Sequence, residues 1–106
     1  MPWEDEDSDS SIETISEEKT QTDHPKMWKV ILLNDDYTSM DFVVSVLETI
    51  FKKAPAEAAQ LMLQVHRKGS AVCGIYAKQI AEAKIVLVHS RAKANGYPLK
   101  CVLEEA

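Results

Sequence analysis

Large apolar side chains are scarce before residue 27, and this division limits the chain to one small folded domain. Of the 106 residues, the first 26 are rich in Asp, Glu, Ser and Thr and carry nine acids against two bases. Such a segment buries too little apolar surface to offset the entropy lost on ordering. We therefore predict a disordered acidic arm over 1–26 and a folded core domain over 27–106. The arm is either a solubilising tail or a tethered segment that orders on a partner, and composition does not decide between them.

The charge of the core excludes some classes of function. Residues 27–106 hold ten bases and eight acids, without a run of Lys and Arg interleaved with aromatic residues, so nucleic-acid binding is disfavoured. No apolar run approaches the roughly 20 residues of a membrane span. The N-terminus lacks the features of a secretion signal, and we expect a cytoplasmic protein that does not contact a membrane. Cys73 and Cys101 lie in apolar runs without CxxC spacing, which favours buried, reduced thiols.

The first half of the core reads as a strand followed by a capped helix. An apolar, β-branched run from Met27 predicts the strand, and the turn-forming segment at 34–36 ends it. Thr38 and Asp41 have the spacing of a capping box and predict the start of the helix. Its apolar repeat, which stops at 52–53, comprises Phe42, Val43, Val46, Leu47, Ile50 and Phe51.

The second half adds a helix, a strand, a longer helix and a last strand. Pro55 suits the first position of a helix and Gly69 suits its left-handed end. The apolar stripe between them is Ala58, Leu61, Met62 and Val65. Residues 70–76 predict a strand, and residues 78–94 predict a long helix whose inward residues are Ile80, Ala83, Leu87 and Val88. Pro98 lies at the entry to a last strand over 99–103.

The order β-α-α-β-α-β predicts an α+β fold. Two successive helices return the chain so that the second strand runs against the first, and the single third helix allows a right-handed crossover to a third strand. The result is a three-stranded antiparallel sheet with the first strand in the centre, packed against three helices.

One constellation of polar residues suggests a binding site. Asn34, Asp35 and Asp36 follow the first strand, and an ordinary turn explains them unless another polar group lies opposite. If the end of the second helix lies near this loop, Asn34, Asp35 and neutral His66 can accept hydrogen bonds from an ammonium group. The apolar neighbours would form a pocket floor, although a plain core explains them equally well; they are Met40, Val43, Met62 and Val65.

The sequence contains few residues suited to catalysis or to metal binding. A metal site needs about three or four well-spaced ligands, but His24 lies in the arm and His89 on another helix. The chain has no GxSxG, HExxH or paired CxxC motif, and its glycines at 69, 74 and 96 cannot form a phosphate loop. We therefore predict no enzymatic activity, no catalytic residue, no metal site and no cofactor.

Three segments closely resemble the ClpS adaptor family: KVILLNDDYTSMDFVVSVL (29–47), QLMLQVHRKGSAVCGIY (60–76) and AEAKI (81–85). The resemblance covers the domain from about residue 27, and NDDYT with the downstream MLxVHxxGxAxCG pattern is specific. It implies an adaptor that binds proteins with a free bulky hydrophobic N-terminal residue (Leu, Phe, Tyr or Trp). It further implies delivery of these proteins to the ClpA unfoldase of the ClpAP protease by a monomeric protein, with the acidic arm serving the handover.

The resemblance also implies a role for each matching residue. Asn34, Asp35 and His66 would hold the substrate's α-amino group, with Asp36 alongside. Met40 would be the gate against β-branched residues in a side-chain pocket lined by Leu32, Thr38, Met40, Val43, Met62, Val65 and Leu99. Glu82 and Lys84 would dock on the unfoldase, whereas Gln79 stands where some relatives carry an acid, so a salt bridge there does not carry over. Ser39 replaces a common Pro and should affect only loop stiffness.

Two other hypotheses compete with the adaptor. An interaction domain would recruit a factor through a helix face and would not recognise N-terminal residues. A divalent-cation hydrolase would use Asp35, Asp36 and His66 and would show metal-dependent turnover.

Overall fold

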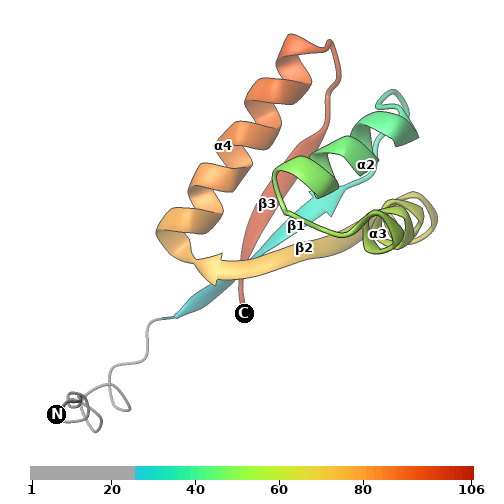
Figure 1. Ribbon diagram of the computed structural model, residues 1–106. Helices are drawn as coiled ribbons and strands as arrows, with labels where there is room; N and C mark the ends of the chain where they lie inside the picture. Colours follow the sequence, from blue (N-terminus) through green and yellow to red (C-terminus); the bar gives the residue numbers. More distant parts are fainter. Residues whose placement is uncertain (1–25) are drawn as a thin grey trace, which may run out of the picture.

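The computed structural model describes residues 26–106, and its element order agrees with the predicted one (Figure 1). The predicted arm over 1–26 lies outside the described residues except for Lys26. In chain order, the elements are β1 (Met27–Leu33), α2 (Met40–Thr49), α3 (Pro55–Lys68), β2 (Ser70–Ala77), α4 (Lys78–Ala94) and β3 (Lys100–Glu105).

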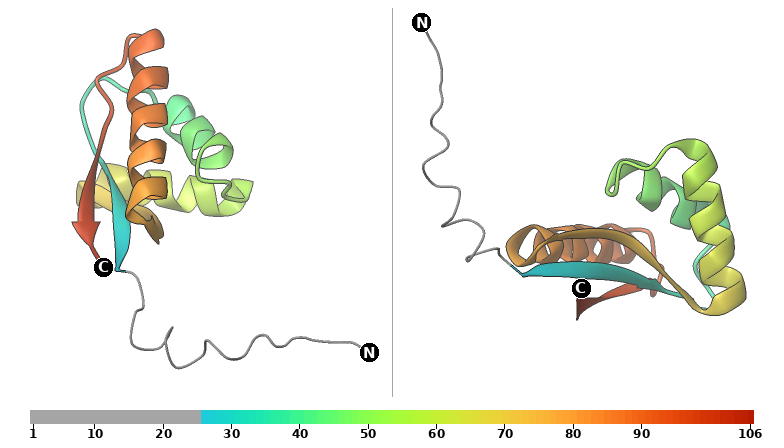
Figure 2. Two further views of the ribbon diagram at one scale, coloured as in Figure 1. Left: turned by 90° about the vertical axis from the view of Figure 1, so that its left-hand side faces the viewer. Right: turned by 90° about the horizontal axis from the view of Figure 1, so that it is seen from below.

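The three strands form one sheet in the order β2-β1-β3, and β1 is antiparallel to both neighbours. All three helices lie on the same face of this sheet, which is visible where the sheet is seen edge-on (Figure 2). The predicted α+β class and the central position of the first strand are therefore confirmed. At one end of the sheet, Leu33 pairs with Ser70 on one side and with Lys100 on the other.

The core fills the space between the sheet and the helices. Alternate residues of β1 point toward the helices, and Val30 and Leu32 are completely buried there. They meet Val46 and Leu47 of α2 and Val88 of α4, which belong to the same apolar cluster. Each such side chain contributes about 1.5–3 kcal/mol when it is removed from water, so this cluster supplies most of the driving force for folding.

The start of α2 differs from the prediction. Ser39, and not Thr38, is the N-cap, because the Ser39 side chain accepts a hydrogen bond from the amide of Phe42. The Thr38 hydroxyl is engaged elsewhere, as a donor to Asp35. The helix also ends earlier than predicted, at Thr49, although the next two apolar residues stay buried.

The helix α3 and the strand β2 follow the predicted signals. Pro55 occupies the first turn of α3, and Gly69 ends the helix with a φ of 93°, a left-handed conformation that glycine adopts without steric cost. In β2 the register with β1 shifts between Val30 and Ile31, so that Cys73 is the extra residue of a bulge. Cys73 and Cys101 are both buried, as predicted, and they do not form a disulfide with each other.

The inward face of α4 was partly mispredicted. Val88 is fully buried, but Ile80, Ala83 and Leu87 face outward, with Ile80 and Leu87 about half exposed. The buried stripe is instead Ala81, Val88 and Ala92, with Ile85 partly buried. Because apolar residues occur on two sides of this helix, its periodicity alone could not identify the side that the sheet covers.

Candidate functional site

The topology of the sheet brings the loop after β1 next to the end of α3. Leu33 is paired with Ser70, the first residue of β2, and β2 directly follows α3. The pairing extends one step further, because the amide of Asn34 donates to the carbonyl oxygen of Gly69 at 2.9 Å. His66 lies one turn earlier on α3 and therefore faces this loop. The proximity of the acidic loop and His66, which the sequence left open, is thus a consequence of strand register.

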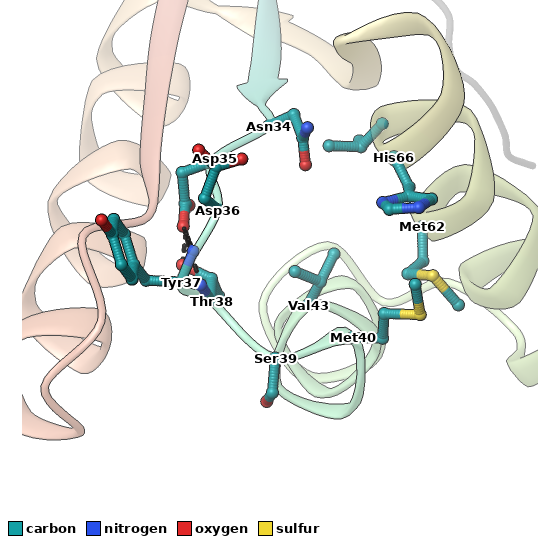
Figure 3. Close-up of a pocket in the computed structure, with 11 residues that line it drawn as sticks. Asn34, Asp35, Asp36, Tyr37, Thr38, Ser39, Met40, Val43, Met62 and His66 are labelled. Atoms are coloured by element: carbon teal, nitrogen blue, oxygen red, sulfur yellow. Dashed lines mark hydrogen bonds between the residues drawn. The ribbon is translucent and has the colours of Figure 1, made fainter.

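A cavity of about 440 Å³ opens between this loop, α2 and α3 (Figure 3). This volume falls within the range of small-molecule binding sites. The lining residues are Asn34, Asp35, Asp36, Tyr37, Thr38, Ser39, Met40, Val43, Met62, Val65 and His66.

The polar groups lie along the rim of this cavity. The loop after β1 contributes the amide of Asn34 and the carboxyl groups of Asp35 and Asp36. His66 lies on the opposite side of the opening, on α3 (Figure 3). Among the residues that line the cavity there is no Lys or Arg, and Asp35 and Asp36 supply its acidic groups. Carboxylate oxygens accept hydrogen bonds and favour a positively charged donor. The rim is therefore suited to a ligand cation.

The Asp35 carboxylate is held by its own loop. Its Oδ1 accepts from the amides of Tyr37 at 2.8 Å and Thr38 at 2.7 Å, and its Oδ2 accepts from the Thr38 hydroxyl at 2.7 Å. Partial burial raises the pKa of Asp35, but these three hydrogen bonds to the ionised form act in the other direction, and the pKa is lowered overall. Asp35 consequently stays ionised and keeps one orientation.

The rest of the cavity, below and beside the polar rim, is apolar. Val43 from α2 and Val65 from α3 are buried and form its floor. Met40 is 46% exposed and Met62 is partly buried, and both lie on the same side of the opening as His66 (Figure 3). Unbranched Met side chains adapt to ligands of different shape, so this part can receive an apolar side chain.

Two of the residues predicted for the side-chain pocket lie deeper. Leu99 is buried and lines a hollow of about 20 Å³ that adjoins the cavity. The residues that line both spaces are Asn34, Asp35, Thr38, Val43 and Val65. Leu32 is completely buried in the core and lines neither space. Leu32 can therefore support the floor from below, whereas the other predicted pocket residues face a cavity or hollow.

Two lining residues were not predicted to line the pocket. Tyr37 is 79% exposed at the rim, and Ser39 lines the cavity while it caps α2. Both belong to the segment that follows Asp36, so their position in the same loop was the available signal. Exposed loop residues have no apolar period that would mark the direction of their side chains.

The residues predicted for unfoldase docking lie on α4, outside the cavity. Glu82 is exposed near the start of the helix. Lys84 is partly buried, and its ammonium group donates to the carbonyl oxygen of Ile50 at 2.8 Å. The same group lies 5.2 Å from the ring centroid of Tyr76. Lys84 therefore makes contacts within the fold that the sequence did not indicate.

The hydrolase hypothesis gains no support from the site. Within residues 26–106 there is no group of three or more His, Cys, Asp or Glu side chains that could hold a metal ion. Asp35, one of the three ligands that this hypothesis needs, is already engaged by three hydrogen bonds from the loop. Over the same residues, no helix is long and apolar enough to cross a membrane.

The fold and the site together define a small α+β binding domain whose cavity joins an acidic rim to an apolar floor. The family model described as "ATP-dependent Clp protease adaptor protein ClpS" matches residues 23–102. The chain belongs to this family, and it is a Clp protease adaptor and not an enzyme.

Relatives from several bacteria agree with this assignment. The ATP-dependent Clp protease adapter protein ClpS of Nitratidesulfovibrio vulgaris is 54% identical over 81 residues, which cover 76% of this chain and 81% of the relative. The protein of the same name from Ralstonia nicotianae is 52% identical over 94 residues, covering 88% of this chain and 87% of the relative.

A solved structure shows the same fold. The structure of Agrobacterium tumefaciens ClpS2 bound to L-phenylalaninamide superposes with a TM-score of 0.76 at 38% sequence identity. The match covers 78% of this chain and all of that chain.

Proposed function

We propose that this adaptor binds proteins that begin with a free, bulky hydrophobic residue (Leu, Phe, Tyr or Trp) and delivers them to the ClpA unfoldase of the ClpAP protease. The observation that carries the proposal is the cavity, in which an acidic rim and an apolar floor lie side by side. An N-terminal residue presents the complementary pair of groups, an ammonium and a side chain on the same Cα.

The ammonium end of the ligand would be held by Asn34, Asp35 and His66, with Asp36 alongside. An ammonium has three donors, and an amide oxygen, a carboxylate and a neutral imidazole nitrogen are three acceptors. Acetylation of the α-amino group removes the charge, and an internal residue has none to offer. The rim therefore provides selectivity for a free N-terminus.

The side-chain end would enter between Met40, Val43, Met62 and Val65, toward Thr38, Leu99 and the underlying Leu32. Burying a Leu or Phe side chain contributes about 1.5–3 kcal/mol, so binding stays modest and reversible. This suits an adaptor that must release its substrate. Met40 stands at the opening, 46% exposed, and would act as the gate that rejects a side chain branched at Cβ.

The ligand of the Agrobacterium structure supports this arrangement. L-Phenylalaninamide has a free amino group, a benzyl side chain and an amide in place of the next peptide bond. Its chemistry is that of an N-terminal Phe, and the family and fold of its receptor are those of this chain.

Delivery requires parts of the chain other than the cavity. We propose that Glu82 and Lys84 belong to the docking surface for ClpA, and that the acidic arm over 1–26 serves the handover. The protein would act as a monomer in the cytoplasm. Because Glu82 and Lys84 lie on α4 while the cavity lies between the loop, α2 and α3, one molecule could hold substrate and unfoldase together.

The first test is fluorescence anisotropy with labelled peptides that differ only at residue one: Leu, Phe, Val or Nα-acetylated Leu. We expect saturable binding of the free Leu and Phe peptides alone. Asp36→Asn should weaken the binding of the free Leu peptide by roughly ten-fold, since it removes a charge from the rim without changing its shape.

Asp41→Asn is the matched control for this variant. Asp41 is also an exposed carboxylate, but it lies on the first turn of α2 and does not line the cavity. Its variant should bind like the wild type. Equal binding of all four peptides, or the same loss in both variants, would contradict recognition of the N-terminal ammonium.

A second candidate function rests on the outer face of α4. Ile80, Val86 and Leu87 are 53%, 65% and 51% exposed, an apolar surface on which a partner could pack. If no peptide binds in the anisotropy assay, recruitment of a factor through this helix face becomes the better reading.

A further inference from the structure

Thr38 lines the apolar pocket, and its polar groups also bind the carboxylate of Asp35. Thr38 is partly buried and lines both the cavity and the small hollow beside Leu99. Its hydroxyl, however, donates to Oδ2 of Asp35 at 2.7 Å, while its amide donates to Oδ1 at 2.7 Å. One residue therefore holds both oxygens of the carboxylate (Figure 3).

The acceptor capacity of Asp35 can be counted. A carboxylate offers about four lone-pair positions, two on each oxygen. Oδ1 accepts from the amides of Tyr37 and Thr38, so both of its positions are filled. Oδ2 accepts only from the Thr38 hydroxyl within the described part of the chain, which leaves one position vacant. A ligand ammonium can use Asp35 only through this remaining position.

The Thr38 hydroxyl determines the direction of that vacant position. The two amide donors bind Oδ1 and leave the carboxylate free to rock about them, whereas a bond to Oδ2 fixes the plane of the group. Loss of this bond would release Oδ2 to turn toward water. A carboxylate fixed before binding loses less freedom when the ligand arrives, and this strengthens the interaction.

We propose that Thr38 is a positioning residue for the α-amino group: its hydroxyl fixes the Asp35 carboxylate so that one acceptor position of Oδ2 serves the ammonium of the bound N-terminal residue. The inference rests on the proposed function, because it assumes that an ammonium is the ligand. It adds a role to Thr38, which otherwise would only line the side-chain pocket. The lowered pKa of Asp35 agrees with it.

The test compares Thr38→Val, which has nearly the same shape but no hydroxyl, with Thr38→Ser, which keeps the hydroxyl and loses the methyl. The ligands are L-phenylalaninamide and its deaminated analogue 3-phenylpropanamide, with affinities measured by calorimetry. In the wild type the amine should bind much more tightly than the analogue. Thr38→Val should reduce that advantage by roughly 3- to 10-fold, the effect of one lost hydrogen bond, and Thr38→Ser should retain it.

A second readout distinguishes positioning from loss of packing. Carboxyl carbon shifts followed by NMR should show a higher pKa for Asp35 in Thr38→Val than in the wild type, with the pKa restored in Thr38→Ser. Loss of packing alone would weaken both ligands to the same extent and leave the Asp35 titration unchanged. Thr49→Val is the control for the substitution itself, since Thr49 lies at the far end of α2 and outside the cavity.

Different results would contradict the proposed function and the positioning role of Thr38. If the wild-type protein binds the amine no better than the deaminated analogue, the proposed function is wrong. If the wild type prefers the amine and Thr38→Val keeps the whole preference, or if Thr38→Ser loses as much of it as Thr38→Val, the positioning role is wrong while the proposed function stands.

Discussion

Gly74 occupies a point of β2 where a side chain has no room. A Cβ at this position would lie 2.2 Å from the hydroxyl oxygen of Tyr76 and 2.5 Å from the ring atom that carries it. The ring cannot move away freely, because it packs near Phe51 at 6.5 Å between centroids and lies below the ammonium of Lys84. The need for glycine here arises from a close approach and not from backbone conformation.

At the scale of the residue, we predict that Gly74→Ala destabilises the fold. Displacing a packed ring costs about 1–3 kcal/mol, and this exceeds the gain of roughly 0.5–1 kcal/mol that Ala normally brings to a strand in place of Gly. Urea unfolding of the four proteins in a double-mutant cycle with Tyr76→Ala tests this. In the Tyr76→Ala background, Gly74→Ala should be neutral or stabilising, and equal destabilisation in both backgrounds would refute the explanation.

At the scale of the element, Lys84 connects α4 with the end of α2. It extends from α4 to the end of α2, where its ammonium donates to the carbonyl oxygen of Ile50 at 2.8 Å. The ends of helices leave carbonyl groups without partners, and a cation at this end is favourable. The ammonium also lies over the rings of Tyr76 and Phe51, at 5.2 and 6.0 Å from their centroids.

We predict that Lys84→Met, which keeps the length of the side chain, lowers the free energy of unfolding by about 1–2 kcal/mol. Lys93→Met is the matched control, because Lys93 is exposed on the last turn of the same helix. A surface change of this kind should alter stability by less than about 0.5 kcal/mol. Similar effects of both variants in urea titrations would show that the contacts of Lys84 contribute nothing specific. Any weaker docking of Lys84→Met to ClpA must be judged against this loss of stability.

At the scale of the whole molecule, the two buried thiols make the free energy of unfolding depend on pH. Burial raises the pKa of Cys73 and of Cys101 to about 12, from an ordinary value of 9.0. An unfolded chain would therefore release these protons near pH 9, while the folded protein keeps them. Between pH 9 and 12 the unfolded state binds fewer protons, so the free energy of unfolding falls as pH rises. Below pH 9 the contribution is fully present.

We predict a loss of stability above pH 9 of at most about 1.4 kcal/mol per pH unit for each thiol. Urea unfolding at pH 8, 9 and 10 in the presence of a reductant measures this slope. The variant Cys73→Ala/Cys101→Ala should be less stable at pH 8, because the substitutions remove core atoms, but its stability should fall less steeply with pH. Parallel curves for the variant and the wild type would assign the slope to other groups.

Local patterns in the sequence were sufficient for the element order and most boundaries. As predicted, α3 begins at Pro55 and ends at Gly69. The fixed φ angle of Pro and the left-handed conformation of Gly are properties of single residues, so the sequence shows them directly. The apolar, β-branched run from Met27 identified β1, and the turn-forming residues at 34–36 identified its end. The acidic loop and His66 were recognised as a potential cation-binding pair. The signals for the elements depend on neighbours within about four positions, which a sequence displays directly. The proximity of the acidic loop and His66, by contrast, follows from the strand register.

Other features were decided only when distant segments met. Thr38 and Ser39 both have side chains that can cap the start of α2. Ser39 is the N-cap because the Thr38 hydroxyl is already bonded to Asp35. The helix α4 offers two apolar sides, and the sheet covers the one whose small residues allow close packing. Lys84 contacts Ile50, which directly follows α2 and lies 34 positions away, and Tyr76 of β2. Propensity and periodicity describe a segment by itself, whereas competition among several hydrogen-bond partners or buried faces is settled by the geometry of the whole fold.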